Sequence, residues 1–170
     1  MKKITALILS LVLTLSLSAF AAAETAVGLP NPWVEYDSLE AAAESAGFEL
    51  RIPYIPEELK ITAIRLIEGS LLEVVYELEG NSIVYRQGPG EEDISGDFTV
   101  YEEAVTEKIE GTEVNVTYKG NGGLVSLMTW QDAGFAYAFY FTPGFDETDA
   151  EVVGQIVASL VFWDALNTGN

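Results

Sequence analysis

Residues 71–78 read Leu-Leu-Glu-Val-Val-Tyr-Glu-Leu, and this stretch decides what kind of fold the chain can form. On an extended chain, successive side chains point to opposite faces, so Glu73 and Glu77 share one face. The apolar side chains fall mostly on the other face: Leu72, Val74, Tyr76 and Leu78. Turn residues precede this stretch at Gly69-Ser70 and follow it at residues 79–81. The pattern predicts a strand with one face on a core and one face in water.

Similar segments lie on both sides of this strand. Residues 60–68 and 82–87 complete a predicted three-stranded antiparallel meander. A second meander is predicted after the break at residues 88–93, and its strands cover residues 113–119, 124–131 and 135–142. The weakest pattern lies between the meanders, over residues 94–109. We therefore expect six or seven strands.

Helices are predicted at both ends of this sheet. Asp37 and Glu40 form a capping box that opens a helix over residues 38–46, and Gly47 follows as its stop. Thr148 and Glu151 form a second box, and the helix that they open has an apolar stripe at Val152, Val153, Ile156, Val157 and Leu160. The expected fold is an α+β domain: a curved antiparallel sheet in two meanders, with one N-terminal and one C-terminal helix packed on it.

The first 23 residues have the pattern of an export signal. Lys2 and Lys3 precede an apolar run over residues 4–20, and small residues ending at Ala23 come before the first acid. The alternative is a permanent anchor, for which an apolar run of about 17 residues is at the lower limit. We expect cleavage after Ala23 and a secreted single domain over residues 24–170, ordered from about 31 to 162, without stable membrane association.

The composition limits the chemistry and the partners. The chain has no histidine and no cysteine, which excludes thiol nucleophiles, histidine bases and zinc sites built from these residues. Without Lys2 and Lys3, six basic residues stand against 27 acidic ones, a net charge of −21. This charge opposes binding to nucleic acid and leaves cations, basic proteins, glycans and other neutral molecules as partners. Solubility alone also explains it.

Two groups of residues are candidates for a site. The first is an acidic loop that contains Glu91, Glu92, Asp93 and Asp97, and its carboxylates could supply oxygen ligands to calcium as a cofactor. The loop lacks the ligand spacing of an EF-hand loop. The alternative, which we favour, is a solvated turn in which Asp93 and Asp97 cap local backbone. The second group consists of aromatic residues that could stack on a sugar or another ligand: Trp130, Tyr137, Trp33 and Tyr54.

Most of the aromatic residues of the last predicted strand are expected to be core. Phe135, Tyr137, Phe139 and Phe141 share one face of it, and alanines alternate with them. The aromatics expected to be partly exposed are Trp33, Tyr36, Tyr54 and Trp130. Arg65 and Arg86 fall inside strands, where an unpaired charge is costly to bury, so we expect cross-strand pairing with an acid such as Glu73.

Several motifs resemble a group of exported proteins from Gram-positive bacteria related to domain of unknown function family 4367. They are Asn31-Pro32 with Glu35-Tyr36, Tyr85-Arg86-Gln87-Gly88, residues 92–97, residues 119–123, and Trp130 before Tyr137. The resemblance implies an exported or membrane-tethered α+β sheet domain and no established reaction. Together with the composition, it favours a secreted, non-enzymatic binding or interaction domain. The alternatives are a carbohydrate or cell-envelope binder that uses exposed aromatics, and a hydrolase that uses two carboxylates.

Overall fold

The computed structural model describes residues 31–54, 56, 59–78, 80–146 and 150–163. The chain divides into two units, Met1–Pro32 and Trp33–Asn170, and the fold described here is that of the second. The predicted export signal, Thr148 of the second capping box, and the side chains of Leu78, Glu151, Val152 and Val153 lie outside the described residues.

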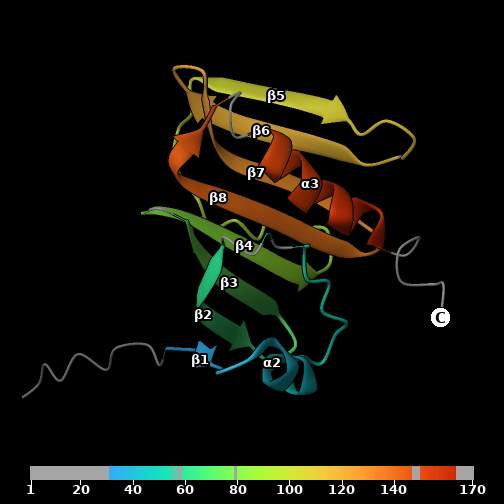
Figure 1. Cartoon of the computed structure of the whole chain (residues 1–170). Helices are drawn as coiled ribbons and strands as arrows, with labels where there is room; N and C mark the ends of the chain where they lie inside the picture. The colour runs from blue at the N-terminus through green and yellow to red at the C-terminus, as the bar shows by residue number, and fades with distance from the viewer. Residues whose placement is uncertain (1–30, 55, 57–58, 79, 147–149, 164–170) are drawn as a thin grey trace, which may run out of the picture. The chain divides into compact units, whose positions relative to one another are not determined.

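One antiparallel sheet of eight strands forms the body of the fold (Figure 1). Its strands are β1 (Val34–Glu35), β2 (Lys60–Ile67), β3 (Leu71–Leu78), β4 (Asn81–Pro89), β5 (Glu103–Lys108), β6 (Asn115–Asn121), β7 (Leu124–Asp132) and β8 (Phe135–Phe145). The order across the sheet is β1-β2-β3-β4-β8-β7-β6-β5. Two meanders, β2 to β4 and β5 to β8, therefore join where β4 pairs with β8.

Two helices accompany the sheet. Helix α2 (Leu39–Ala46) begins at Ser38, whose Oγ accepts a hydrogen bond from the Ala41 amide at 3.2 Å. It ends at Gly47, where a φ of 73° favours glycine. Helix α3 (Ala150–Val161) lies across the second meander and buries Ile156, Val157 and Leu160 (Figure 1). Among the described residues, neither helix combines the length and apolar character that a membrane-crossing helix needs.

The core lies between the helices and one face of the sheet. Leu66, Leu72 and Val74 fill it in the first meander, and Met128, Trp130, Tyr137 and Phe139 fill it in the second. The rings of Trp130 and Tyr137 stack with centroids 4.9 Å apart. Large aromatic side chains bury much apolar surface, so this cluster contributes strongly to stability.

An extended segment over residues 48–54 covers part of the core face, and the buried side chain of Gln87 holds it there. The Arg51 amide donates to Gln87 Oε1 at 2.8 Å, and Gln87 Nε2 donates to the Glu49 carbonyl at 2.9 Å. Tyr85 adds a hydrogen bond from its hydroxyl to the Arg51 carbonyl at 2.5 Å. At its far end the Tyr54 amide donates to Ser159 Oγ of α3 at 2.7 Å. The segment thus links β4 to α3.

The α+β class, the two meanders and the two helices are confirmed. The sheet has more strands than the six or seven expected, because the two-residue β1 and the edge strand β5 belong to it. β4 continues to Pro89, through residues predicted to break the sheet. The first helix is capped by Ser38 and not by Asp37, because the chain turns into the helix one residue later than the capping box predicts.

Candidate binding site

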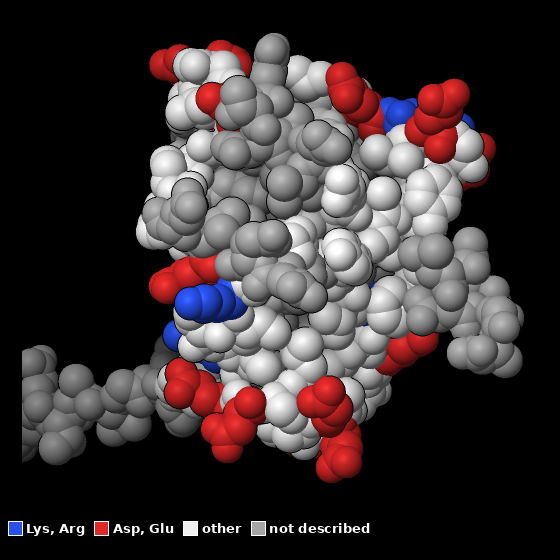
Figure 2. All heavy atoms as spheres, viewed as in Figure 1, with Lys and Arg blue, Asp and Glu red and all other residues white. Residues whose placement is uncertain are grey.

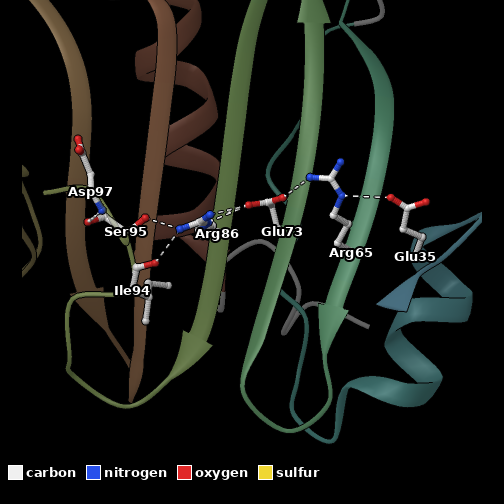
Figure 3. Close-up of polar contacts among 7 residues, drawn as sticks. All are labelled: Glu35, Arg65, Glu73, Arg86, Ile94, Ser95 and Asp97. Atoms are coloured by element: carbon white, nitrogen blue, oxygen red, sulfur yellow. Dashed lines mark hydrogen bonds and ion pairs between the residues drawn. The ribbon is translucent and has the colours of Figure 1, made fainter. Parts of the chain in front are cut away.

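The face of the sheet opposite the core carries a row of charged side chains (Figure 3). Strand register places Glu35 beside Arg65, Arg65 beside Glu73, and Glu73 beside Arg86. Glu73 accepts from Arg65 Nη1 at 2.8 Å through one oxygen, and from Arg86 Nε and Nη2 at 2.9 and 2.8 Å through the other. Glu35 accepts from Arg65 Nε at 3.3 Å. The predicted pairing of both arginines with Glu73 is confirmed.

Arg86 also holds the segment that crosses this face. Its Nη1 donates to the carbonyls of Ile94, at 3.4 Å, and of Ser95. Its guanidinium lies 5.4 Å from the ring centroid of Tyr140 and 6.0 Å from that of Trp33, within the range of cation–π contacts. Gly96 fits here because a Cβ would stand 2.9 Å from Arg86 Nη1 and its φ is 65°. Arg86 therefore ties residues 94–96 to the sheet.

The predicted acidic loop forms local turns. The Ser95 amide donates to Asp93 Oδ1 and the Thr99 amide donates to Asp97 Oδ1, both at 2.8 Å. Glu91 and Glu92 are exposed. Within the described ranges, no three acidic side chains come close enough together to hold a metal ion. Asp93 and Asp97 thus cap local backbone as the alternative predicts, and the calcium hypothesis stays a prediction.

Tyr101 closes this turn and gives it a dependence on pH. Its hydroxyl donates to Asp97 Oδ2, and burial together with that hydrogen bond raises the pKa of Tyr101 to about 12. For Asp97, burial alone would raise the pKa, but hydrogen bonds from Thr99 and Tyr101 together with the charge of Lys119 bring it below its usual range. The protonated phenol beside the ionised carboxylate is thus the stable pairing.

Replacing Tyr101→Phe should lower stability near neutral pH, and this loss should diminish as the pH rises towards the raised pKa of Tyr101. Folding raises the pKa of Tyr101 from about 10 to about 12, so its contribution is complete below pH 10 and is lost as the pH rises through that window. We expect the difference in urea midpoint between wild type and Y101F to shrink from pH 9 to pH 12. A difference that stays constant over that range would contradict this assignment.

The four aromatic residues predicted for a ligand site do not come together on a surface. Trp130 and Tyr137 are only 4% and 1% exposed and lie in the core, so the expectation that Trp130 is partly exposed is wrong. Tyr54 is 63% exposed, and Trp33 is half-buried beside Arg86. The strand register explains why Trp130 is buried: Trp130 pairs directly with Tyr137, so both side chains lie on the core face of the sheet.

Three hollows of the surface are lined mainly by polar groups. One of about 240 Å³ on the open face lies among Asn115, Thr117, Thr129 and Gln131. A second of about 470 Å³ lies between the turns at Glu113 and Ala133, and a third of about 440 Å³ lies beside Asp97 and Tyr140. The second is lined by carboxylates from three separate turns, Glu91, Glu113 and Asp132, and the third by the half-buried rings of Tyr101 and Tyr140.

A fourth hollow, of about 500 Å³, is different in chemistry. It lies between α3 and strands β5 to β7, and we call it the α3 pocket. Its lining is apolar apart from a carboxylate and a phenol: Val105, Glu107, Ile109, Tyr118, Val125, Met128, Phe145, Gly154, Val157 and Ala158. α3 lies over the strands nearer the middle of the sheet and leaves β5 beside it uncovered (Figure 1). Its volume lies in the range usual for small-molecule pockets, and its lining is mostly apolar as theirs is.

Gly154 lies in the wall of the α3 pocket. It lies within α3, where glycine costs about 1 kcal/mol relative to alanine. Nothing in its surroundings demands glycine, because its φ is not positive and a Cβ there would meet no atom within 4 Å. Gly154, Val157 and Ala158 have the spacing of one helix face, and that face lines the pocket. The small side chains at two of these positions leave space that larger ones would fill.

The polar groups of the α3 pocket disfavour an anionic ligand. Burial, and then the nearby charge of Glu107, raises the pKa of Tyr118, so this phenol is a neutral hydrogen-bonding group at ordinary pH. The remaining polar side chain of the lining is the Glu107 carboxylate itself. Acidic side chains, with basic ones among them at one end, lie along the rim of the molecule where Figure 1 places β5 and β6 (Figure 2). A neutral or cationic ligand with an apolar part suits this setting.

Sequence reasoning missed the residues of this pocket. The useful signal was Gly154, a glycine inside an otherwise strong helical pattern, where it costs stability relative to alanine. Val105 and Glu107 belong to the stretch with the weakest periodicity.

No protein-family model, no curated protein and no solved structure matches this chain. The likeness to domain of unknown function family 4367 rests on the sequence motifs and stays a prediction.

Proposed function

We propose that this protein is a secreted, non-catalytic binding domain whose ligand-binding site is the α3 pocket. The observation that carries the proposal is a mostly apolar hollow of about 500 Å³ whose lining includes a helical glycine that no backbone or packing constraint requires. The predicted export signal and the absence of histidine and cysteine support the remaining parts.

The pocket suits an apolar group with a neutral or cationic end. Its floor is formed by Tyr118, Val125 and Met128, one wall by Val105 and Ile109, and the other wall by α3. Burying apolar surface contributes about 25 cal/mol per Å², so an aliphatic or aromatic group seated here gains affinity without a specific polar contact. Glu107 and Tyr118 then select the polar end.

Replacing Gly154→Leu should abolish ligand binding without unfolding the protein. The new side chain extends into empty space, and leucine favours the helix by most of the roughly 1 kcal/mol that glycine costs. We expect N-phenyl-1-naphthylamine, an uncharged apolar dye whose fluorescence rises in apolar surroundings, to bind wild type saturably. G154L should bind this dye at least about tenfold more weakly, a loss of about 1.4 kcal/mol.

The matched control is Gln155→Leu. It adds the same side chain to the neighbouring, exposed position of α3. Q155L should bind the dye as wild type does, and both variants should keep the wild-type circular dichroism. Equal dye binding by G154L and wild type would contradict the proposal.

A further inference from the structure

Strand β5 is a free edge of the sheet. It ends the strand order, and all six of its residues are exposed, with Val105 at 54%. Nothing among the described residues pairs with its outer side. An exposed edge of this kind is a template for a further strand.

The pairing with β6 shows which backbone groups of this edge are free. The Ile109 amide donates to the Val114 carbonyl at 2.9 Å, and the register then runs without a shift from Lys108↔Asn115 to Glu103↔Gly120. In an antiparallel pair, residues alternate between bonding the partner and pointing away from it. Ala104, Thr106 and Lys108 therefore direct their amide and carbonyl groups outward.

The side chains of the same strand divide between two faces. Val105 and Glu107 line the α3 pocket, together with Ile109 just beyond the strand, and Glu103 has the same parity. Thr106 faces the other way, where its hydroxyl lies 2.9 Å from that of Thr117. A strand added beside β5 would therefore place every second side chain on the side of the α3 pocket.

Charge indicates what that strand contains. The pocket side of β5 reads Glu103, Val105, Glu107, so directly opposite positions suit a basic, an apolar and a basic residue. These would be non-hydrogen-bonded pairs, in which side chains are closest. A second copy of this chain fits badly, because antiparallel pairing about Val105 would set Glu103 against Glu107 of the other copy.

We propose that the natural occupant of the α3 pocket is an extended segment of another protein that adds to β5 as a strand. It carries the pattern basic-x-apolar-x-basic, and its apolar side chain enters the pocket. This inference rests on the proposed function and names the partner of the same site. Backbone hydrogen bonds to Ala104, Thr106 and Lys108 supply register, and the two glutamates supply specificity.

Two peptides of identical composition test the inference. Fluorescein-labelled TKTVTKT places both lysines on the same face as valine, whereas TTKVKTT places them on the opposite face. We expect saturable fluorescence anisotropy for the first and at least about tenfold weaker binding of the second. Equal binding of both peptides would show only attraction between opposite net charges and would overturn the inference.

Variants of β5 give a second test of the inference. Ala104→Pro removes one outward amide, and proline is tolerated at such an edge position because the β6 ladder is untouched. A104P should bind TKTVTKT at least about tenfold more weakly, and the matched Ala104→Ser should bind it as wild type does. Glu107→Lys should reverse the preference, so that TETVTKT binds better than TKTVTKT.

The outcomes separate this inference from the proposed function. If the dye binds in the pocket and TKTVTKT does not displace it, the partner is not an added strand. In that case Glu103 and Glu107 only prevent the β5 edges of two copies from pairing with each other. If A104P binds the peptide as wild type does, strand addition is overturned. If the dye fails to bind wild type, the proposed function itself falls.

Discussion

Replacing Arg86→Met is expected to lower the free energy of unfolding by about 3 kcal/mol, the cost typical of breaking a buried ion pair. Methionine keeps most of the aliphatic stem and removes only the guanidinium. Glu73 has a side chain that is 7% exposed, and it would lose the hydrogen bonds from Nε and Nη2. The carbonyls of Ile94 and Ser95 would lose their donor as well. Urea unfolding at 25 °C measures the loss.

Arg65→Met is the matched control. Arg65 donates to the same carboxylate at 2.8 Å, but its side chain is 37% exposed where that of Arg86 is 22% exposed. In R65M, Glu73 keeps both hydrogen bonds from Arg86, and the more exposed Arg65 is better screened by water, so this change should cost about 1 kcal/mol. Equal losses in the two variants would contradict the central position of Arg86 in this row.

Replacing Gln87→Met is expected to cost about 2–4 kcal/mol, because it strands one buried backbone group at about 1–3 kcal/mol and removes a second, part-buried hydrogen bond that contributes about 1 kcal/mol. The Arg51 amide would lose its acceptor and the Glu49 carbonyl would lose its donor. Gln87 is fully buried, so water does not replace the amide without rearrangement. Methionine has nearly the same shape, so the loss reports the hydrogen bonds and not a cavity.

Gln131→Met serves as the control for this prediction. Gln131 donates to the Glu91 carbonyl from an exposed position, so water can take over the contact. Its replacement should change stability by less than about 0.5 kcal/mol, as is usual at the surface. If Q87M unfolded within about 1 kcal/mol of wild type, Gln87 would not be the anchor of residues 48–54.

Much of the sheet was predictable because the pattern of each long strand is local. The alternation in residues 71–78 gives both the burial of Val74 and the exposure of Glu77. The same alternation places Glu73 on the face that carries Arg65 and Arg86. Its pairing with them was predictable because an unpaired charge within a sheet is costly to bury. Ile156, Val157 and Leu160 were likewise predictable from helical spacing.

The remaining elements depend on contacts that no local pattern encodes. β1 has two residues and exists only because Val34 and Glu35 meet β2, some thirty positions away in sequence. β5 is exposed on both faces, so it lacks the alternation of a half-buried strand. The α3 pocket needs the position of α3 relative to β5, which joins residues about fifty positions apart. Spacing within the sequence does not reveal it.

The placement of Trp130 shows a signal that could have been used. Trp130 and Met128 lie two residues apart on β7 and both are buried, as period-two alternation requires. Counting parity back from the short turn at residues 133–134 sets Trp130 opposite Tyr137. An aromatic residue paired across strands with a core residue belongs to the core, whatever its position near the end of a strand.

The most direct measurement of the central claim is a methyl NMR titration of the full chain with 1-octanol, an uncharged apolar probe. We predict saturable shifts for the methyl groups of Val105, Val125, Met128, Val157 and Ala158, which line the α3 pocket, and none for Leu66 and Leu72 in the first meander. The pocket shifts should disappear in G154L and persist in Q155L. Octanol shifts confined to other parts of the protein, or unchanged in G154L, would contradict the claim that the α3 pocket is the binding site.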